Sequence, residues 1–525
     1  MLDRAIEEVG ELRTNDGYID THLREPLVEE NAFVRMPQED VPPPSFEDAW
    51  DVLPRPFWEG HEGVIDCYRG AWELAFANLR RPEAGSGFVV NFIDTAFNDC
   101  LFMWDSAFIL LFARYGRHAF DFQRTLDNLY ARQHPDGFIC REIGTLDGED
   151  RFERFDATST GPNVMPWTEW EHYGDTADHE RLERVFPVLV SYHRWLRRHR
   201  TWRDGTYWTS GLGSGMDNQP RFEQRPAGRV GWPERLTYHG HAVWIDACLQ
   251  QVLSAALLSR MADALGRREE VADLREERDR LSLAVNERLW NEKTSFYHDE
   301  LADGTLSEVK TIGAYWALLA GVVPQERIAP FVGHLQDPSG FGRPHRVPSL
   351  SADHPEYDAG GGYWLGGVWP PTNYMVLRGL DQAGYHELAH EISREDLDHV
   401  ARVFGETRTL WENYAPERAA PGNRAKDDFV GWSGLAPVAG LFEYVLGLRA
   451  DARNGRLLWD VRLQERHGVN GYPFGRDGVL DLSCAARSAA GEEPEIQIRS
   501  TVPLELVIRW NGRQKTVVAH GEVKS

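Results

Sequence analysis

The feature that most constrains the fold is an alternation of long segments of helical spacing with links rich in glycine, proline and aromatic residues. Between about residues 62 and 448, apolar residues recur every three or four positions, as in 62–80, 178–199 and 386–404. This spacing is typical of helices that bury one face, and it predicts about ten to twelve of them. Because short links alternate with elaborate ones, we expect a mainly α protein built as a ring of helical hairpins.

The chain divides by composition into three predicted parts. A length of 525 residues is typical of about two to four domains, or of one large repetitive domain with appendages. Residues 1–60, with VPPPSF at 41–46, indicate an N-terminal extension, and residues 61–453 hold the helical pattern. Residues 454–525 contain short alternating stretches such as RLLWDVRL and GVLDLSCAAR. These stretches predict a small C-terminal antiparallel β-domain.

Charge and cysteine usage exclude several classes of protein. There are 57 basic against 82 acidic side chains, and the net charge of −25 argues against nucleic acid or an anionic membrane as a partner. The five cysteines are odd in number and widely spaced, so neither a disulfide framework nor a zinc site is indicated. The N-terminus lacks the pattern of a signal peptide, and no apolar run approaches the ~20 residues of a membrane span. We therefore expect a cytoplasmic enzyme.

Tryptophan is over-represented, with 19 residues. Many lie beside glycine, proline or acidic residues rather than inside apolar runs. One interpretation is aromatic filling of a large core. The other is a carbohydrate cleft, because indole faces stack on sugar rings while carboxylates bind hydroxyls. The second interpretation implies a small-molecule carbohydrate as the partner.

The stretch GLGSGMDNQPRF at 211–222 contains a single acidic residue, Asp217, which follows three closely spaced glycines. It does not match a dinucleotide-binding fingerprint, because the third glycine position is Met216 and a proline follows soon after. A flexible turn with Asp217 bonding to its own backbone is one interpretation. The other is that the glycines bring the backbone close to a ligand, with Asn218 and Arg221 available to bind hydroxyls.

A second isolated carboxyl, Glu412, lies in TLWENYAPE at 409–417, between Trp411 and Tyr414. A solvated surface glutamate is the plain alternative. Two carboxyls far apart in sequence, each in an aromatic link, are what glycoside hydrolysis needs, since one must be protonated and the other ionised.

Two further segments are candidates for sugar binding. Trp104 and Asp105 begin an apolar helix, where the acid either caps the helix or binds hydroxyls beside a stacking indole. GGGYWLGGVWPP at 360–371 holds Tyr363, Trp364 and Trp369 between glycines, which favours stacking against a ligand over core packing.

In HPDGFICREI at 134–143, a buried ion pair and substrate binding are equally plausible for Arg141 and Glu142. No HExxH motif or close cluster of histidine and cysteine is present, so no metal and no cofactor is expected. The G-x-S-x-G nucleophile motif is also missing, because GWSGL has Leu435 where it needs glycine. Carboxylate chemistry is favoured.

Taken in order, MWDSAF, SGMDNQPR, YWLGGVWPPTNYMVLRGL, LWENYAPE and GWSGLAP resemble the clan of (α/α)₆-barrel inverting glycosidases. The pattern is most similar to glycoside hydrolase family 63 and its mannosylglycerate-hydrolase-like branch, over about residues 90–448. The resemblance implies an (α/α)₆ barrel of helical hairpins. One departure is Leu365, where the family often has arginine after the tryptophan of its Y-W-R-G segment.

The resemblance also implies roles for individual residues. Asp217 matches the family's general acid and Glu412 its general base. The remaining matches are substrate-binding positions: Trp104 and Asp105 at the subsite for the non-reducing sugar, Tyr363, Trp364 and Trp369 as an aromatic wall, and Asn218, Arg221 and Trp432 as further contacts.

The function expected from these matches is exo-acting, inverting hydrolysis of a small α-glycoside. The glycone is expected to be α-glucosyl or α-mannosyl, and the substrate a disaccharide or a glycosyl-glycerate. Inversion calls for carboxyls about 6.5–9.5 Å apart, against about 5–5.5 Å for retention. Two alternatives remain open: a glycoside phosphorylase on the same barrel, and a non-catalytic carbohydrate-binding protein.

Overall fold

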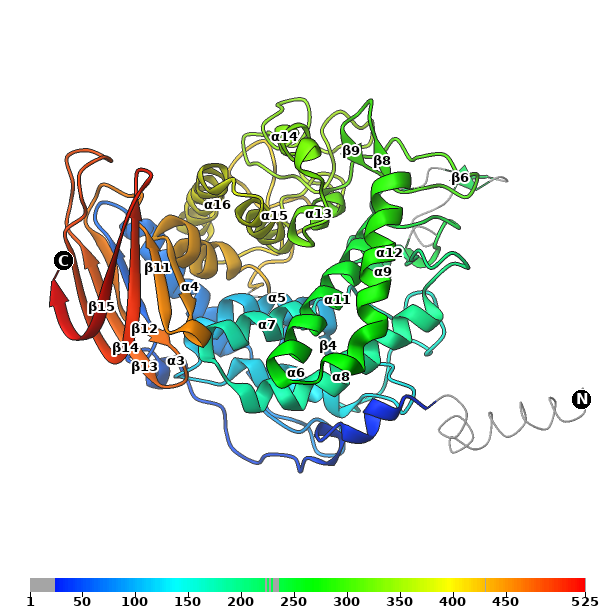
Figure 1. Cartoon of the computed structure of the whole chain (residues 1–525), viewed down its shortest axis with the longest axis horizontal. Coiled ribbons are helices and arrows are strands. Elements are labelled where there is room, and N and C mark those ends of the chain that lie inside the picture. Colours follow the sequence, from blue (N-terminus) through cyan, green and yellow to red (C-terminus); the bar gives the residue numbers. More distant parts are fainter. Residues whose placement is uncertain (1–23, 222–223, 226–227, 230–235, 430, 525) are drawn as a thin grey trace, which may run out of the picture.

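The computed structural model describes residues 24–221, 224–225, 228–229, 236–429 and 431–524. The chain forms a helical part and a β-sheet that stands at one side of it (Figure 1). The prediction of a mainly α protein with a C-terminal sheet is confirmed at this level. Of the predicted N-terminal extension, residues 1–23 lie outside the described residues, and the boundaries at 60 and 453 stay predictions.

The helices at the centre are largely buried. Every residue of α5 is buried, as is expected of a helix surrounded by others. Contacts between these helices pass in turn through α5, α7, α11, α13, α15 and η7, and from η7 back to α5. Their bounds are α5 Met103–Ala113, α7 Met165–Thr176, α11 Ile245–Leu265, α13 Trp316–Leu319, α15 Pro370–Gln382 and the π-helix η7 Leu435–Val445.

A second set of helices packs against these from outside. Here α4 contacts α16 and η7, α6 contacts α5, α8 contacts α7 and α11, and α12 contacts α11. Gly70 of α4 lies so close to α16 that a Cβ would be 2.3 Å from the ring of Phe404. The bounds are α3 Phe46–Ala49, α4 Glu62–Ala77, α6 Thr125–Ala131, α8 His179–His199, α12 Ala272–Arg288, α14 Gln325–Gly333 and α16 His386–Thr407.

The remaining elements are short and lie in the links. The 3₁₀ helices are η1 Pro26–Glu30, η2 Phe33–Arg35, η3 Arg114–Gly116, η4 Phe122–Arg124, η5 Arg268–Val271, η6 Ile312–Tyr315 and η8 Ala452–Asn454. The two-stranded pairs are β2 Leu79–Arg80 with β3 Phe92–Ile93, β4 Cys100–Phe102 with β5 Glu142–Gly144, β6 Gln224–Arg225 with β7 Gly228–Arg229, and β8 Trp290–Asn291 with β9 Phe296–Tyr297. The pairing of β4 with β5 places Glu142 opposite Phe102, next to the start of α5.

The large sheet has the order β1-β12-β13-β14-β11-β10, with β15 paired to β14. All pairs are antiparallel except β11 with β14. Strand β1 comes from before the first long helix and forms an edge, where Pro56 is tolerated. The bounds are β1 Arg55–Trp58, β10 Leu448–Asp451, β11 Arg456–Asp460, β12 His467–Phe474, β13 Gly478–Cys484, β14 Ile496–Trp510 and β15 Arg513–Lys524.

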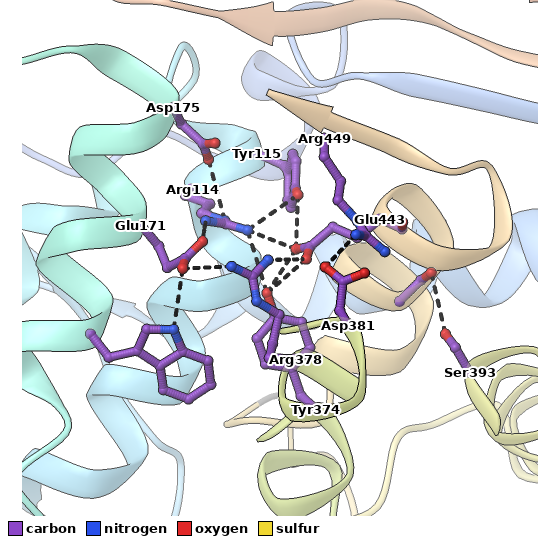
Figure 2. Close-up of polar contacts among 12 residues, drawn as sticks. Arg114, Tyr115, Glu171, Asp175, Tyr374, Arg378, Asp381, Ser393, Glu443 and Arg449 are labelled. Carbon is purple, nitrogen blue, oxygen red and sulfur yellow. Dashed lines mark hydrogen bonds and ion pairs between the residues drawn. The ribbon is translucent and has the colours of Figure 1, made fainter. Parts of the chain in front are cut away.

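A buried network of arginines and acids lies where the helices meet the sheet (Figure 2). Arg114 pairs with Glu443 at 2.7 Å, and Arg378 joins Glu443 at 3.0 Å to Glu171 at 2.6 Å. Arg449 of β10 pairs with Asp381 of α15. Burial acts to raise the pKa of Glu171, but Arg378 and Arg114 outweigh it and hold the pKa below its ordinary value. The network therefore joins the helices to the sheet with paired charges.

Candidate active site

Asp217 follows a one-turn helix, α9 (Gly211–Ser214), that begins after Ser210 and ends at Gly215. The hydroxyl of Ser210 accepts a hydrogen bond from the backbone N–H of Gly213 at 3.1 Å. Gly215 has a φ of +72°, and a Cβ at this position would lie 3.0 Å from the indole of Trp104. Glycine therefore lets the loop turn and lie flat against that ring.

Glu412 is held in the link between α16 and η7. Its backbone N–H donates to the carbonyl of Lys426 at 2.9 Å, and the N–H of Lys426 donates to Glu412 Oε2 at 3.2 Å. The indole N–H of Trp432 donates to the carbonyl of Glu412 at 2.8 Å. Only 3% of the residue is exposed, so it is not a solvated surface glutamate.

Tyr363 connects the two carboxyls. Its hydroxyl donates to Glu412 Oε1 at 3.3 Å, and a hydrogen-bonding interaction of the same hydroxyl lowers the pKa of Asp217. Tyr363 has a φ of +68°, a left-handed conformation that is unfavourable for a bulky residue. Strained backbone of this kind persists where the surrounding structure enforces it, and it is found preferentially at functional sites.

Asp217, Glu412 and Tyr363 line one cavity of about 160 Å³. The structure thus brings together seven of the ten residues that the sequence predicted for the site. The lining residues are Phe97, Asn98, Phe102, Trp104, Asp105, Arg141, Glu142, Gly161, Pro162, Leu212, Gly215, Asp217, Tyr363, Trp364, Glu412 and Trp432.

Both predicted catalytic carboxyls have pKa values near neutrality. Burial raises the pKa of Asp217 to about 6, and the charge of Glu142 adds to this, while Arg141 acts against it. Burial also raises the pKa of Glu412 to about 7, and Asp217 adds to this. The predicted base therefore has the higher pKa of the two, the reverse of the order expected for a separate acid and base. Near neutral pH the pair gives up its protons in coupled steps, and it can both donate and accept one.

A third carboxyl, Asp105, lies in the first turn of α5 and lines the same cavity. Burial raises its pKa well above the ordinary value, and the charges of Glu412 and Asp217 add to this. Asp105 is therefore close enough to both carboxyls to feel their charge. The indole N–H of Trp104, beside it, is buried and has no hydrogen-bond partner.

Arg221, predicted to contact substrate, does not reach the cavity. Its guanidinium is buried and bonds to Asp246 at 2.6 and 2.9 Å and to Asp299 at 2.7 and 2.8 Å. These two carboxylates lie far along the chain, so the sequence motif gave no sign of them. Arg221 stabilises the segment that follows Asp217.

Asn218 and Trp369, also predicted to contact substrate, do not line the cavity but contact residues that do. The Asn218 side chain donates to the carbonyl of Gly362 at 3.1 Å and accepts from the N–H of Trp364 at 2.9 Å. The ring of Trp369 stacks on that of Trp364, with centroids 3.9 Å apart and planes at 2°. Both residues hold the Tyr363–Trp364 segment in place.

Arg141 and Glu142 line the cavity and pair with each other at 3.1 Å. The predicted ion pair is therefore present, and substrate binding by these residues stays a prediction. Sequence reasoning missed Phe97, Phe102 and Leu212. Phe102 and Leu212 are immediate neighbours of predicted motifs, which is the signal that could have identified them.

A larger cavity, of about 360 Å³, lies beside the charged network of Figure 2. It contains none of the predicted site residues. Its acids Glu171, Asp175, Asp381 and Glu443 are each within 4 Å of an arginine. Against the effect of burial, the paired arginines hold the pKa values of Glu171 and Asp381 below their ordinary values, in contrast to the raised pKa values of Asp217 and Glu412.

Within the described ranges, no group of three or more histidine, cysteine, aspartate or glutamate side chains is placed to hold a metal ion. None of the helices in the described part of the chain is long and apolar enough to cross a membrane.

Residues 100–433 match the family model described as the mannosylglycerate hydrolase MGH1-like glycoside hydrolase domain. This match covers more than half of the chain and includes the segments that carry Asp217 and Glu412. The chain belongs to this family. It is therefore a glycoside hydrolase, and the prediction of a family 63-like enzyme is confirmed.

Two relatives of this glycoside hydrolase show how low the sequence identity to curated proteins is. The mannosylglycerate hydrolase of Thermus thermophilus is 26% identical over 358 residues, which is 56% of this chain and 85% of the relative. An uncharacterised protein of Borreliella burgdorferi is 23% identical over 317 residues. That match spans 58% of this chain but only 63% of the relative's own length.

The solved structures agree on the fold. A crystal structure of the family 63 mannosylglycerate hydrolase from Thermus thermophilus, in complex with glucose, aligns with a TM-score of 0.57 at 23% identity. The alignment covers 70% of this glycoside hydrolase and 98% of the Thermus chain. Leu365, the departure noted above, is not among the residues that line the cavity.

Proposed function

We propose that this enzyme is an exo-acting, inverting hydrolase of small α-glycosides. The observation that carries the proposal is that the half-buried Asp217 and the buried Glu412 line one small cavity together with Tyr363, whose hydroxyl interacts with both carboxyls. The cavity's size and its aromatic lining suit a terminal sugar rather than the middle of a polymer.

In the proposed mechanism Asp217 is the general acid and Glu412 the general base. Asp217 gives its proton to the glycosidic oxygen as the bond from that oxygen to the anomeric carbon breaks. Glu412 takes a proton from the water that attacks the anomeric carbon from the opposite face, so the product has inverted configuration. Trp104, Asp105 and Trp364 bind the terminal sugar, and Tyr363 orients both carboxyls.

The pKa values of the two carboxyls determine how much of the enzyme is in the protonation state that this mechanism needs. Since the pKa of Glu412 is about 7 and that of Asp217 about 6, the form with Asp217 protonated and Glu412 ionised is the minor one. We expect a bell-shaped dependence of kcat/KM on pH, centred near 6.5, because both lower and higher pH deplete this form.

We further propose that the helices form an (α/α)₆ barrel. Support comes from the cycle of contacts through α5, α7, α11, α13, α15 and η7, with the other long helices outside it. The glycone is proposed to be α-mannosyl or α-glucosyl. The Thermus relative, named as a mannosylglycerate hydrolase, supports the first.

The test is a screen of aryl and natural α-glycosides, with the anomer of the released sugar followed by NMR. Asp217→Asn serves as the blank, and the exposed Glu269→Gln serves as the matched control for a charge change elsewhere. We expect inverted product from the parent and a loss of about 10²–10⁴-fold in kcat for Asp217→Asn. Retained configuration would overturn the inverting mechanism, and cleavage that needs phosphate would identify a phosphorylase. Full turnover by both Asp217→Asn and Glu412→Gln would overturn the assignment of the site.

A further inference from the structure

The residues that line the cavity differ widely in exposure, and we call the exposed end of the cavity its mouth. Trp364, Glu412 and Trp432 are each at most 5% exposed, whereas Phe97 is 49% exposed and lines the same cavity. In an exo-acting enzyme the terminal sugar occupies the closed end, so the group released by hydrolysis faces the mouth. Phe97 is thus on the aglycone side.

Phe97 is held in place rather than simply left exposed. The ammonium of Lys426 donates to the carbonyl of Phe97 at 3.2 Å and also to that of Ala96, and it lies 5.5 Å from the Phe97 ring. The edge of Phe102 meets the same ring with centroids 6.0 Å apart. Ala96 has a left-handed φ of +60°, which shows that the segment is constrained. Through its backbone, Lys426 also contacts Glu412, so the same residue connects the mouth to the carboxyl.

The lining holds more acidic than basic side chains. Four carboxyls, Asp105, Glu142, Asp217 and Glu412, line the cavity, and among the described lining residues Arg141 is the one cation. The Arg141 guanidinium already donates to Glu142 at 3.1 Å and to the carbonyl of Leu212 at 3.2 Å. It also lies 4.7 Å from the ring of Phe152.

Lys426, a further cation in the described part of the chain, is bonded to two backbone carbonyls at the mouth. A substrate carboxylate would therefore lie among several acidic side chains, with no uncommitted cation to receive it among the described lining residues. An electrically neutral aglycone avoids this cost.

The geometry points to Phe97 as the aglycone platform, which takes a neutral sugar ring and disfavours an aglycone that bears a carboxylate. The flat apolar face of a pyranose matches an aromatic ring fixed at the edge of a pocket, whereas a short polar chain has no such face. This inference rests on the proposed function. It narrows the substrate from any small α-glycoside to a disaccharide or longer oligosaccharide.

The test compares three α-glycosides that share the glycone found in the screen. The aglycone is a neutral sugar in the first, glycerol in the second and glycerate in the third. We expect the parent's kcat/KM for the disaccharide to exceed that for the glycerate glycoside by tenfold or more. Phe97→Ala should lower kcat/KM for the disaccharide about three- to tenfold, the range of an aromatic contact. It should change kcat/KM for the glycerol glycoside less than twofold.

Phe155→Ala is the matched control, because Phe155 is 56% exposed and does not line the cavity. It should leave all three substrates unchanged, and Phe97→Trp should restore the disaccharide preference. Hydrolysis of the glycerate glycoside as fast as the disaccharide would overturn the inference. So would an equal loss on all three substrates in Phe97→Ala, which would indicate a merely structural role. Either result would leave the hydrolase proposal standing, whereas that proposal fails if the parent cleaves no glycoside.

Discussion

Replacing Tyr363 by phenylalanine removes one hydroxyl and keeps the ring. That hydroxyl donates to Glu412 at 3.3 Å and interacts with Asp217, and in both cases it stabilises the ionised carboxylate. A hydrogen bond to a charged group contributes about 1.5–3 kcal/mol net. At about 1.36 kcal/mol per pKa unit this equals about one to two units. Because 3.3 Å is long for such a bond, we take the lower end.

The sign follows from the direction of the shift. Without the hydroxyl, the pKa of Glu412 should rise from about 7 to about 8, because its ionised form has lost a donor. The base must be ionised to work, so kcat/KM below about pH 6 should fall about tenfold. Because Glu412 has the higher pKa of the two, the apparent pKa of the alkaline limb should rise by about one unit. The apparent pKa of the acidic limb, set by Asp217, should move in the same direction by a smaller amount. At about pH 6 the variant should lose about tenfold more activity than at about pH 9.

The assay is kcat/KM measured from about pH 4 to about pH 10 on one aryl glycoside. Tyr357→Phe is the matched control, since the Tyr357 hydroxyl donates to Glu417 at 2.7 Å and lies outside the cavity lining. A pH profile of Tyr363→Phe that keeps the parent's limbs, or shifts to lower pH, would refute the placement of this hydroxyl between the two carboxyls.

Three further predictions concern stability and packing. Since the pKa of Glu412 is raised from 4.5 to about 7, the free energy of unfolding falls as pH rises between these values. Glu412→Gln should therefore be more stable than the parent by about 3 kcal/mol at about pH 8 and equal to it at about pH 4, as measured by denaturant unfolding. Gly70→Ala should destabilise by about 1–3 kcal/mol, because its Cβ would meet Phe404 at 2.3 Å; an unchanged Tm would contradict this packing. Gly215→Ala should cost about 1–2 kcal/mol from its φ of +72° and displace Trp104, so kcat/KM should fall; full activity would count against the role of this glycine.

Much of the helical architecture followed from local pattern. Segments such as 178–199 and 386–404 carry their apolar spacing within themselves, and they form α8 and α16. Helix α7 was missed because MPWTEWEHYGDT mixes polar and aromatic residues without a clear period. Strand β1 was missed because its partner, β12, lies some four hundred residues later.

For the candidate site, too, local sequence predicted some features and missed others. Asp217 and Glu412 stood out because each is a single acid in a glycine-rich or aromatic link. Their meeting in one cavity, and the pKa values near neutrality, depend on burial that no local pattern encodes. The role of each residue as acid or base remains a prediction.

The sequence by itself determined the helical class, the terminal sheet and the family, and it singled out the two candidate carboxyls. Each of these depends on the residue types and spacing within short stretches of the chain. The tertiary structure alone decided which neighbours those stretches meet. In the folded chain, Arg221 forms ion pairs with Asp246 and Asp299 instead of lining the cavity. Trp369 stacks on Trp364, and Phe97 lines the cavity at its mouth. The physical reason is that desolvation, ion pairing and ring stacking act between groups that are close in space, however far apart they lie along the chain.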